Sequence, residues 1–295
     1  MIAGGWFLVG APWDCSGTRR GERDAPDALR GAGLTGLVGR DLGDVATAID
    51  STERDPRTGV RALPETVCAA EELADRLFQA MHELPGQRPL VVGGDCSILL
   101  GIFPALRKAI GPVGLWFVDG HPDYLDGPGS DTGETADMDL AVLNGDGAAP
   151  LVTLAGIPPM VAARETVLLG HRTEGLDDGS RAEMARLPAD LRRIDAATLT
   201  RDPVAAGRRG AAWLERAGRG AWLHLDLDVL HPGCLPAVTY PQPGGPDWEQ
   251  LSAALRPMAR SPRLLGASVA DFRPDLDPSG ALATRIVGLL DHVLP

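Results

Sequence analysis

The chain has 295 residues, of which 44% are hydrophobic and 23% are charged. This balance is typical of a soluble globular protein and excludes disordered and fibrous chains. The formal net charge of -12 argues against a nucleic-acid or anionic-membrane partner, because both bind basic surfaces, and favours a small cationic partner. The four cysteines form no C-x-x-C pair, so neither a disulfide framework nor a zinc ribbon is predicted, and a cytoplasmic location is expected.

Short apolar runs recur along the chain and predict β-strands. Most runs are continuous rather than alternating, which is typical of parallel strands that are buried on both faces. The expected strands are 6–9, 89–92, 113–118, 166–169, 221–227 and 264–269.

No membrane-spanning segment is expected. The longest weakly polar stretch, 148–163, is shorter than the ~20 apolar residues that span a bilayer.

Helical patterns separate these strands. The clearest is 65–84, where apolar residues recur every three or four positions, and 247–259 and 281–293 behave alike. The alternation of strand and helix predicts an α/β fold with a doubly wound, mostly parallel sheet. Because no linker or repeat interrupts the pattern, one domain is expected over residues 1–295. Ligands of such sheets bind beyond the carboxyl ends of the strands.

A first polar cluster follows the expected strand 113–118. Asp119, His121 and Asp123 are spaced two residues apart, so their side chains converge if the chain leaves the strand extended. Pro122 favours this geometry, because it biases the residue before it towards an extended conformation. The cluster therefore predicts a shared binding point.

Two further clusters lie at the ends of other expected strands. Asp226 and Asp228 share one face of an apolar strand, where unpaired acids are costly. The glycine turn 93–97 follows a third strand and opens a helix. Carboxylates with one imidazole suit Mn, Fe, Co or Zn, and several acids around one spot repel each other without cations. We therefore predict a two-metal centre, with a metal-free salt-bridge cluster as the alternative.

These residues resemble the signature motifs of the arginase/agmatinase (ureohydrolase) superfamily. The three motifs occur in the family's order, and the likeness extends over nearly the whole chain. The motifs are 93–97, 119–123 and 226–228, and the likeness also includes the segments 10–14, 20–21, 25–30, 41–44 and 243–245.

The resemblance implies a three-layer α/β/α fold, a homo-oligomer and a hydrolase that acts on C–N bonds in linear amidines. It also implies two Mn²⁺ ions per chain, with Zn²⁺, Fe²⁺, Ni²⁺ and Co²⁺ as alternatives. These ions would activate a bridging hydroxide, which attacks a guanidinium carbon and releases urea. By resemblance, Asp119 and Asp226 bridge both ions and are catalytic. Asp123 would complete the first metal site, and His121 with Asp228 the second.

The sequence departs from the family at several positions. Cys96 stands where the family usually has its first metal-binding histidine, so it is the expected ligand there, with a plain buried thiol as the alternative. A thiolate makes the ligand set more anionic and favours softer ions. Asp271 stands where the family usually has a glutamate that binds the guanidinium of the substrate, so Asp271 is expected to bind substrate. Ala136 occupies the position of the proton-shuttle histidine.

Other residues are expected to compensate for these departures. Glu134 is a candidate for both catalysis and substrate binding, because a basic leaving group needs a proton donor. His231 precedes Pro232 where the family commonly has aspartate, and it is a candidate for substrate binding. The segment 170–174 lacks the acids with which arginases bind the α-amino group of arginine, so the sequence does not predict which guanidino compound is the substrate.

The leading hypothesis is a metal-dependent hydrolase of a guanidino compound. Cys96 also resembles the cysteine of hydrolases that convert N-hydroxyarginine and release hydroxyurea. A mononuclear zinc amide hydrolase of the deacetylase type is a further alternative. The last is a non-catalytic protein that binds guanidino compounds, in which Cys96 and Ala136 mark lost activity.

Overall fold

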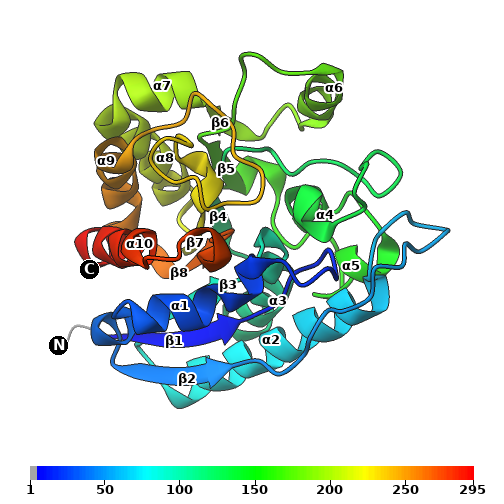
Figure 1. The fold of residues 1–295 in the computed structure, drawn as a ribbon, viewed down its shortest axis with the longest axis horizontal. Helices are drawn as coiled ribbons and strands as arrows, with labels where there is room; N and C mark the ends of the chain where they lie inside the picture. The colour runs from blue at the N-terminus through cyan, green and yellow to red at the C-terminus, as the bar shows by residue number, and fades with distance from the viewer. Residues whose placement is uncertain (1–4) are drawn as a thin grey trace.

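A computed structural model describes residues 5–295; the first four residues of the expected domain lie outside this range. An eight-stranded sheet runs through it in the order β2-β1-β3-β8-β7-β4-β5-β6, and all neighbouring strands are parallel (Figure 1). The doubly wound α/β fold is thus confirmed. The strands are β1 (Trp6–Ala11), β2 (Arg40–Asp44), β3 (Arg88–Gly93), β4 (Gly114–Val118), β5 (Thr166–Leu169), β6 (Arg192–Ile194), β7 (Ala221–Asp226) and β8 (Leu264–Ala270).

The two strands that the sequence pattern did not predict, β2 and β6, are the edges of the sheet. Both consist mainly of exposed polar residues, so they lack the apolar run that marks a buried strand. The predicted boundaries differ from the observed ones by at most two residues, and one difference has a clear cause. Leu227, expected as the last residue of a strand, instead begins a short 3₁₀ turn, Leu227–Val229, because the side chain of Asp226 accepts the N–H of Asp228 and bends the chain.

Helices cover both faces of the sheet (Figure 1). Helices α2 and α3 pack against each other on one face, and α8, α9 and α10 cover the other. Among the residues that the structure describes, no helix has the length and apolarity to cross a membrane. The helices are α1 (Ala25–Gly31), α2 (Leu63–Glu83), α3 (Leu99–Ile110), α4 (Asp139–Leu143), α5 (Ala149–Val152), α6 (Asp178–Arg186), α7 (Ala196–Arg201), α8 (Pro203–Ala217), α9 (Trp248–Ala259) and α10 (Ala281–Val293).

Alternate side chains of the strands build two separate cores. On β1, Phe7 and Val9 enter the core beneath α2 and α3, whereas Trp6 and Leu8 enter the core beneath α8, α9 and α10. This alternation follows from the two-residue period of a strand. Because both faces are covered, the central strands must be apolar throughout, and this is why they appear in the sequence as continuous hydrophobic runs.

Four adjacent strands position the polar clusters. The sheet order places β3, β8, β7 and β4 side by side, and their carboxyl ends lie at the same edge. Cys96 follows β3, Asp119 follows β4, Asp226 ends β7 and Asp271 follows β8. Residues that lie up to 175 positions apart in the chain, from Cys96 to Asp271, are thereby brought to one point.

Candidate metal centre

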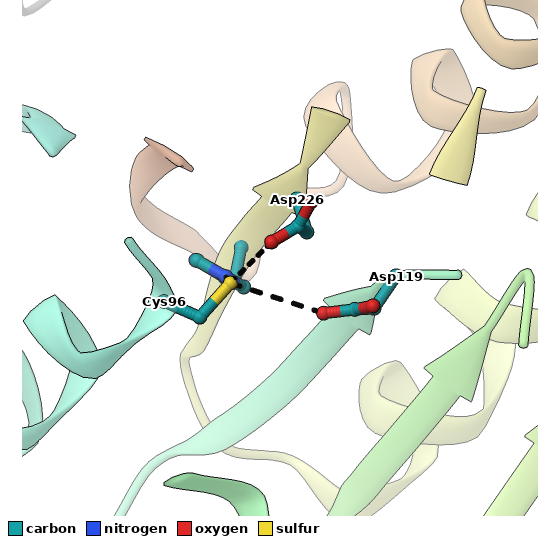
Figure 2. Close-up of side chains that lie close together, drawn as sticks. Cys96, Asp119 and Asp226 are labelled. Atoms are coloured by element: carbon teal, nitrogen blue, oxygen red, sulfur yellow. Dashed lines mark hydrogen bonds between the residues drawn. The ribbon is translucent and has the colours of Figure 1, made fainter. Parts of the chain in front are cut away.

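Cys96, Asp119 and Asp226 converge at the carboxyl ends of β3, β4 and β7. The thiol of Cys96 contacts the carboxylate of Asp226, and its Sγ lies 3.9 Å from Oδ2 of Asp119 (Figure 2). All three side chains are buried. Cys96 reaches this position because it opens a short 3₁₀ turn, which Asp95 caps by accepting the N–H of Ser97 at 3.0 Å.

His121 and Asp228, together with Asp119, form a second group of candidate metal ligands. Nδ1 of His121 lies 2.7 Å from Oδ2 of Asp228 and 3.9 Å from Oδ1 of Asp119. The other oxygen of Asp228 accepts the N–H of Gly120 at 3.0 Å, which ties the end of β7 to the end of β4. Donor atoms of Asp119, His121 and Asp228 all lie within 4.8 Å of one another, so a second ion could bind between them.

Two acids of the site adopt a positive φ. Asp123 has a φ of +47° and Asp271 a φ of +64°. For residues other than glycine this conformation costs about 1–3 kcal/mol, and such strain is concentrated at functional sites. The carboxylate of Asp271 accepts the N–H of Thr239 at 3.2 Å and lies within 4.8 Å of oxygens of Asp226 and Asp228. Asp271 therefore faces the candidate metal centre.

The electrostatics of the cluster fit bound cations. Burial and the repulsion of neighbouring acids raise the pKa of Asp119, Asp123 and Asp226 well above the ordinary range. Burial alone would lower the pKa of His121, but neighbouring carboxylates raise it to about 9. Burial and the nearby acids also raise the pKa of the Cys96 thiol. Carboxylates, an imidazole and a thiol together are suitable ligands for divalent transition metals, whose charge would offset this repulsion.

A hydrogen-bonded chain from Trp222 ends on Cys96. The indole N–H of Trp222 donates to Oγ of Ser268 at 2.8 Å, which lies 2.8 Å from Nδ1 of His224. Nε2 of His224 lies 3.3 Å from Sγ of Cys96. Because an indole only donates, Ser268 can direct its own proton to Nδ1, which leaves the imidazole proton on Nε2. Burial lowers the pKa of His224 to about 3, so the ring is neutral, and in the tautomer with its proton on Nε2 it donates to the sulfur.

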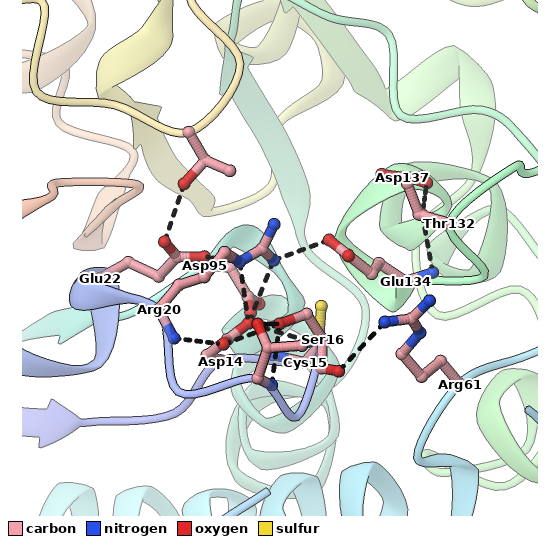
Figure 3. Close-up of polar contacts among 12 residues, drawn as sticks. Asp14, Cys15, Ser16, Arg20, Glu22, Arg61, Asp95, Thr132, Glu134 and Asp137 are labelled. Carbon is pink, nitrogen blue, oxygen red and sulfur yellow. Dashed lines mark hydrogen bonds and ion pairs between the residues drawn. The ribbon is translucent and has the colours of Figure 1, made fainter. Parts of the chain in front are cut away.

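Arg20 is the centre of a buried ion-pair network beside the metal centre. Its Nη2 lies 3.0 Å from Oδ1 of Asp14 and 2.7 Å from Oε2 of Glu134, and its Nε lies 3.2 Å from Oε1 of Glu22 (Figure 3). Burial raises the pKa of Glu134, although Arg20 opposes the shift. The hydroxyl of Tyr240 lies 3.5 Å from the same Glu134 oxygen. This network fixes Glu134 at the wall of the site.

A cavity of about 710 Å³ opens at the candidate metal centre. Eleven of its lining side chains are Asp or Glu, whereas the arginines among them are Arg20 and Arg186. Both arginines are ion-paired, Arg20 within its network and Arg186 with Asp126 at 2.8 Å and Asp146 at 3.1 Å. The cavity therefore suits a small cation.

The structure places most of the predicted site residues together. Glu134, Asp271 and Ala136 line the cavity. His231 does not: it is exposed, and its Nδ1 accepts the N–H of Gly233 at 3.0 Å. The geometry gives no support to a substrate-binding role for His231. The six predicted metal ligands belong to overlapping clusters of close donor atoms: Cys96, Asp119, His121, Asp123, Asp226 and Asp228.

Sequence reasoning missed two buried acids, Asp139 and Glu183. Asp139 opens α4 beside Cys96, and Glu183 on α6 lines the cavity and accepts the N–H of Tyr124 at 2.8 Å. A usable signal for Asp139 is the apolar run 140–143 that follows it, since an acid at a buried helix start needs a partner. Helix α6 is mostly polar and has no regular apolar period, so no local pattern distinguishes Glu183 from its exposed neighbours.

Glu22 gives the metal-free protein a specific pH dependence. Burial and the nearby Asp95 raise the pKa of Glu22 from 4.5 to about 7, although Arg20 opposes the shift. Stability from this group is fully present below pH 4.5 and is lost as pH rises towards 7, because ionisation then favours the unfolded chain. We expect Glu22→Gln to flatten this decline in the free energy of unfolding, measured by urea denaturation from pH 4.5 to 8. The exposed Glu83→Gln is the control, and an unchanged slope in Glu22→Gln would contradict the assignment.

The sequence and the fold were both compared with those of known proteins, and both comparisons point to the same family. A profile of the arginase family matches residues 5–293. The arginase of Brevibacillus brevis is 31% identical, and the match covers 97% of this chain and 96% of that protein. The structure of arginase from Bacillus caldovelox superimposes with a TM-score of 0.88 and 27% identity and covers 98% of both chains. Arginase from Bacillus cereus gives a TM-score of 0.84 and 28% identity over 97% of both chains.

Proposed function

The chain belongs to the arginase family, and we propose that it uses metal ions held at the carboxyl ends of the strands. Like its family, it is a hydrolase that acts on C–N bonds in the linear amidine group of guanidino compounds. The observation that carries this proposal is the convergence of Cys96, His121 and the aspartates at the floor of an acidic cavity. No other described cavity contains such a set of donors.

We propose the following distribution of metal ligands. Asp119 belongs to close donor clusters with Cys96 and with His121, so it is suited to lie between two ions. Cys96 and Asp226 contribute to one site, which Asp123 completes, and His121 with Asp228 holds the other. Bound Mn²⁺, or Zn²⁺, Fe²⁺, Ni²⁺ or Co²⁺, would acidify a water molecule and stabilise the charge that develops at the guanidinium carbon.

Asp271 is proposed to bind the guanidinium of the substrate. Its carboxylate lies at the metal centre and is oriented by the N–H of Thr239, so it can accept hydrogen bonds from a planar cation. Glu134 is proposed to supply the proton that the leaving amine requires, in the absence of a histidine at Ala136. Its raised pKa, caused by burial, favours the protonated form nearer to neutral pH than an exposed carboxyl group allows.

The charge of the cavity favours a particular kind of guanidino substrate. Neither cavity arginine is free to bind a carboxylate, because Arg20 and Arg186 are already paired with acids. Acids outnumber these cations in the lining, so a substrate with a second positive charge is favoured over one with a carboxylate. We therefore propose that agmatine-like compounds are better substrates than arginine or N-hydroxyarginine.

The test is a substrate panel for the Mn-loaded protein. Urea and hydroxyurea would be measured by mass spectrometry with agmatine, arginine, N-hydroxyarginine, guanidinobutyrate, guanidinopropionate and guanidine. Preference for agmatine would support the charge argument, and preference for arginine or N-hydroxyarginine would overturn it. If neither urea nor hydroxyurea is released from any compound while metal is bound, amide hydrolysis or a non-catalytic role would be favoured.

The role of Asp271 gives a separate prediction. Asp271→Asn removes the charge that pairs with the guanidinium but keeps the shape of the side chain. We expect kcat/KM to fall about a hundredfold, as is typical when one partner of a buried charge pair is lost. The measurement is steady-state urea release, with metal content determined in the same sample. Unchanged kcat/KM with full metal content would show that another group binds the guanidinium.

A further inference from the structure

Asp139 is a buried carboxylate with no partner in the protein. It is the first residue of α4 and is 0% exposed, and the four residues that follow it in the helix are also buried. Within residues 5–295, neither of its carboxylate oxygens has a hydrogen-bond partner. Burial and the repulsion of Asp119 and Asp95 raise the pKa of Asp139 well above the ordinary range, although the backbone N–H of Leu140 opposes the shift. Buried carboxylates are normally paired, hydrogen-bonded or bound to metal.

The carboxylate of Asp139 lies at the metal centre. One of its oxygens, Sγ of Cys96 and an oxygen of Asp123 all lie within 4.8 Å of one another. Ligand atoms about 2.0–2.3 Å from one ion lie up to about 4.6 Å apart, so donors within 4.8 Å of one another need only a small adjustment to share an ion. All three groups are buried, and each becomes anionic when it loses its proton.

We propose that Asp139 is a ligand of the metal ion bound by Cys96 and Asp123. This inference rests on the proposed metal centre and adds a ligand that lies outside its three strand-end motifs. A bound cation would satisfy the carboxylate and offset its repulsion with Asp123. With a thiolate and oxygen donors at one ion, the site would favour Zn²⁺ or Co²⁺ over Mg²⁺ or Ca²⁺.

The test compares Asp139→Asn with a matched control, Asp131→Asn. Asparagine keeps the shape of Asp139 but removes its charge. Asp131 is an exposed acid on the wall of the same cavity, so its substitution removes one nearby charge without removing a proposed ligand. Full-length protein would be freed of metal and titrated with Co²⁺ and Zn²⁺ against a chromophoric chelator. The thiolate-to-Co²⁺ absorption band reports on the ion at Cys96, and Cys96→Ser identifies that band.

We expect Asp139→Asn to weaken metal binding at the Cys96 site at least about tenfold and to alter the Co²⁺ band. Asp131→Asn should leave affinity within about twofold. The melting temperature of metal-free Asp139→Asn should equal or exceed that of the wild type, because the substitution removes an uncompensated buried carboxylate. The metal-induced rise in melting temperature should be smaller than in the wild type.

Each other outcome has a definite meaning. Unchanged affinity and an unchanged Co²⁺ band in Asp139→Asn would overturn the inference and show that Asp139 is a protonated structural acid. Equal losses in both variants would reduce its role to a general charge effect and would also overturn it. Metal binding that depends on Asp139, without urea release from any guanidino compound, would sustain the inference while the proposed function fails. A wild-type chain that binds no divalent metal would overturn both.

Discussion

Asp226→Asn is expected to abolish urea release and to remove most of the bound metal. Asp226 contacts Cys96, and its donor atoms belong to close clusters with both Asp119 and Asp228, so it is shared by both halves of the centre. Loss of a shared ligand should weaken metal binding by about a hundredfold or more, since even outer partners of ligands are worth 10–100-fold. The measurements are metal content after dialysis and urea release under saturating substrate.

The stability of the metal-free variant separates loss of metal from loss of fold. In the metal-free state Asp226 is repelled by neighbouring acids, which raise its pKa together with burial. Asparagine removes this repulsion, so metal-free Asp226→Asn should melt no lower than metal-free wild type. Asp291→Asn, an exposed position on α10, serves as a control for the substitution itself. A variant that keeps its metal and its activity would refute the proposed centre.

Arg20→Met is expected to destabilise the protein by about 3 kcal/mol, because it leaves the buried carboxylates of Asp14, Glu22 and Glu134 without their shared cation. Methionine retains most of the aliphatic length of the side chain, so the loss reports mainly on charge. The Arg20 side chain is 18% exposed, which places the expected value at the low end for a buried ion pair. The measurement is the free energy of unfolding in urea at pH 7.5.

The neighbouring Arg19 provides a matched control. Arg19 pairs with Asp50 at 2.9 Å, but its side chain is 66% exposed. Exposed pairs contribute little, so Arg19→Met should unfold with nearly wild-type stability. Because protonation relieves the unpaired acids, the defect of Arg20→Met should shrink at pH 5. Equal stability of Arg20→Met and Arg19→Met at pH 7.5 would show that the network does not depend on its central cation.

Local sequence patterns were sufficient to find the motifs that we propose to bind metal, because each motif lies directly at the end of a strand. An apolar run such as 113–118 indicates where a buried strand ends, and a two-residue period indicates that Asp119, His121 and Asp123 follow together. The carboxyl ends of parallel strands share one edge, so motifs from separate strands could be assigned to one site. The edge strands β2 and β6 escaped prediction because exposed strands need no apolar run.

The sequence by itself thus determined the α/β class, the central strands and the six acidic, imidazole and thiol groups at their ends. Only the tertiary structure decided which groups from distant segments complete the site. It pairs Glu134 with Arg20, aims His224 at the sulfur of Cys96, buries Asp139 without a partner and leaves His231 exposed. The physical reason is that strand periodicity fixes the side on which a residue points, whereas contacts between loops depend on how separate elements pack.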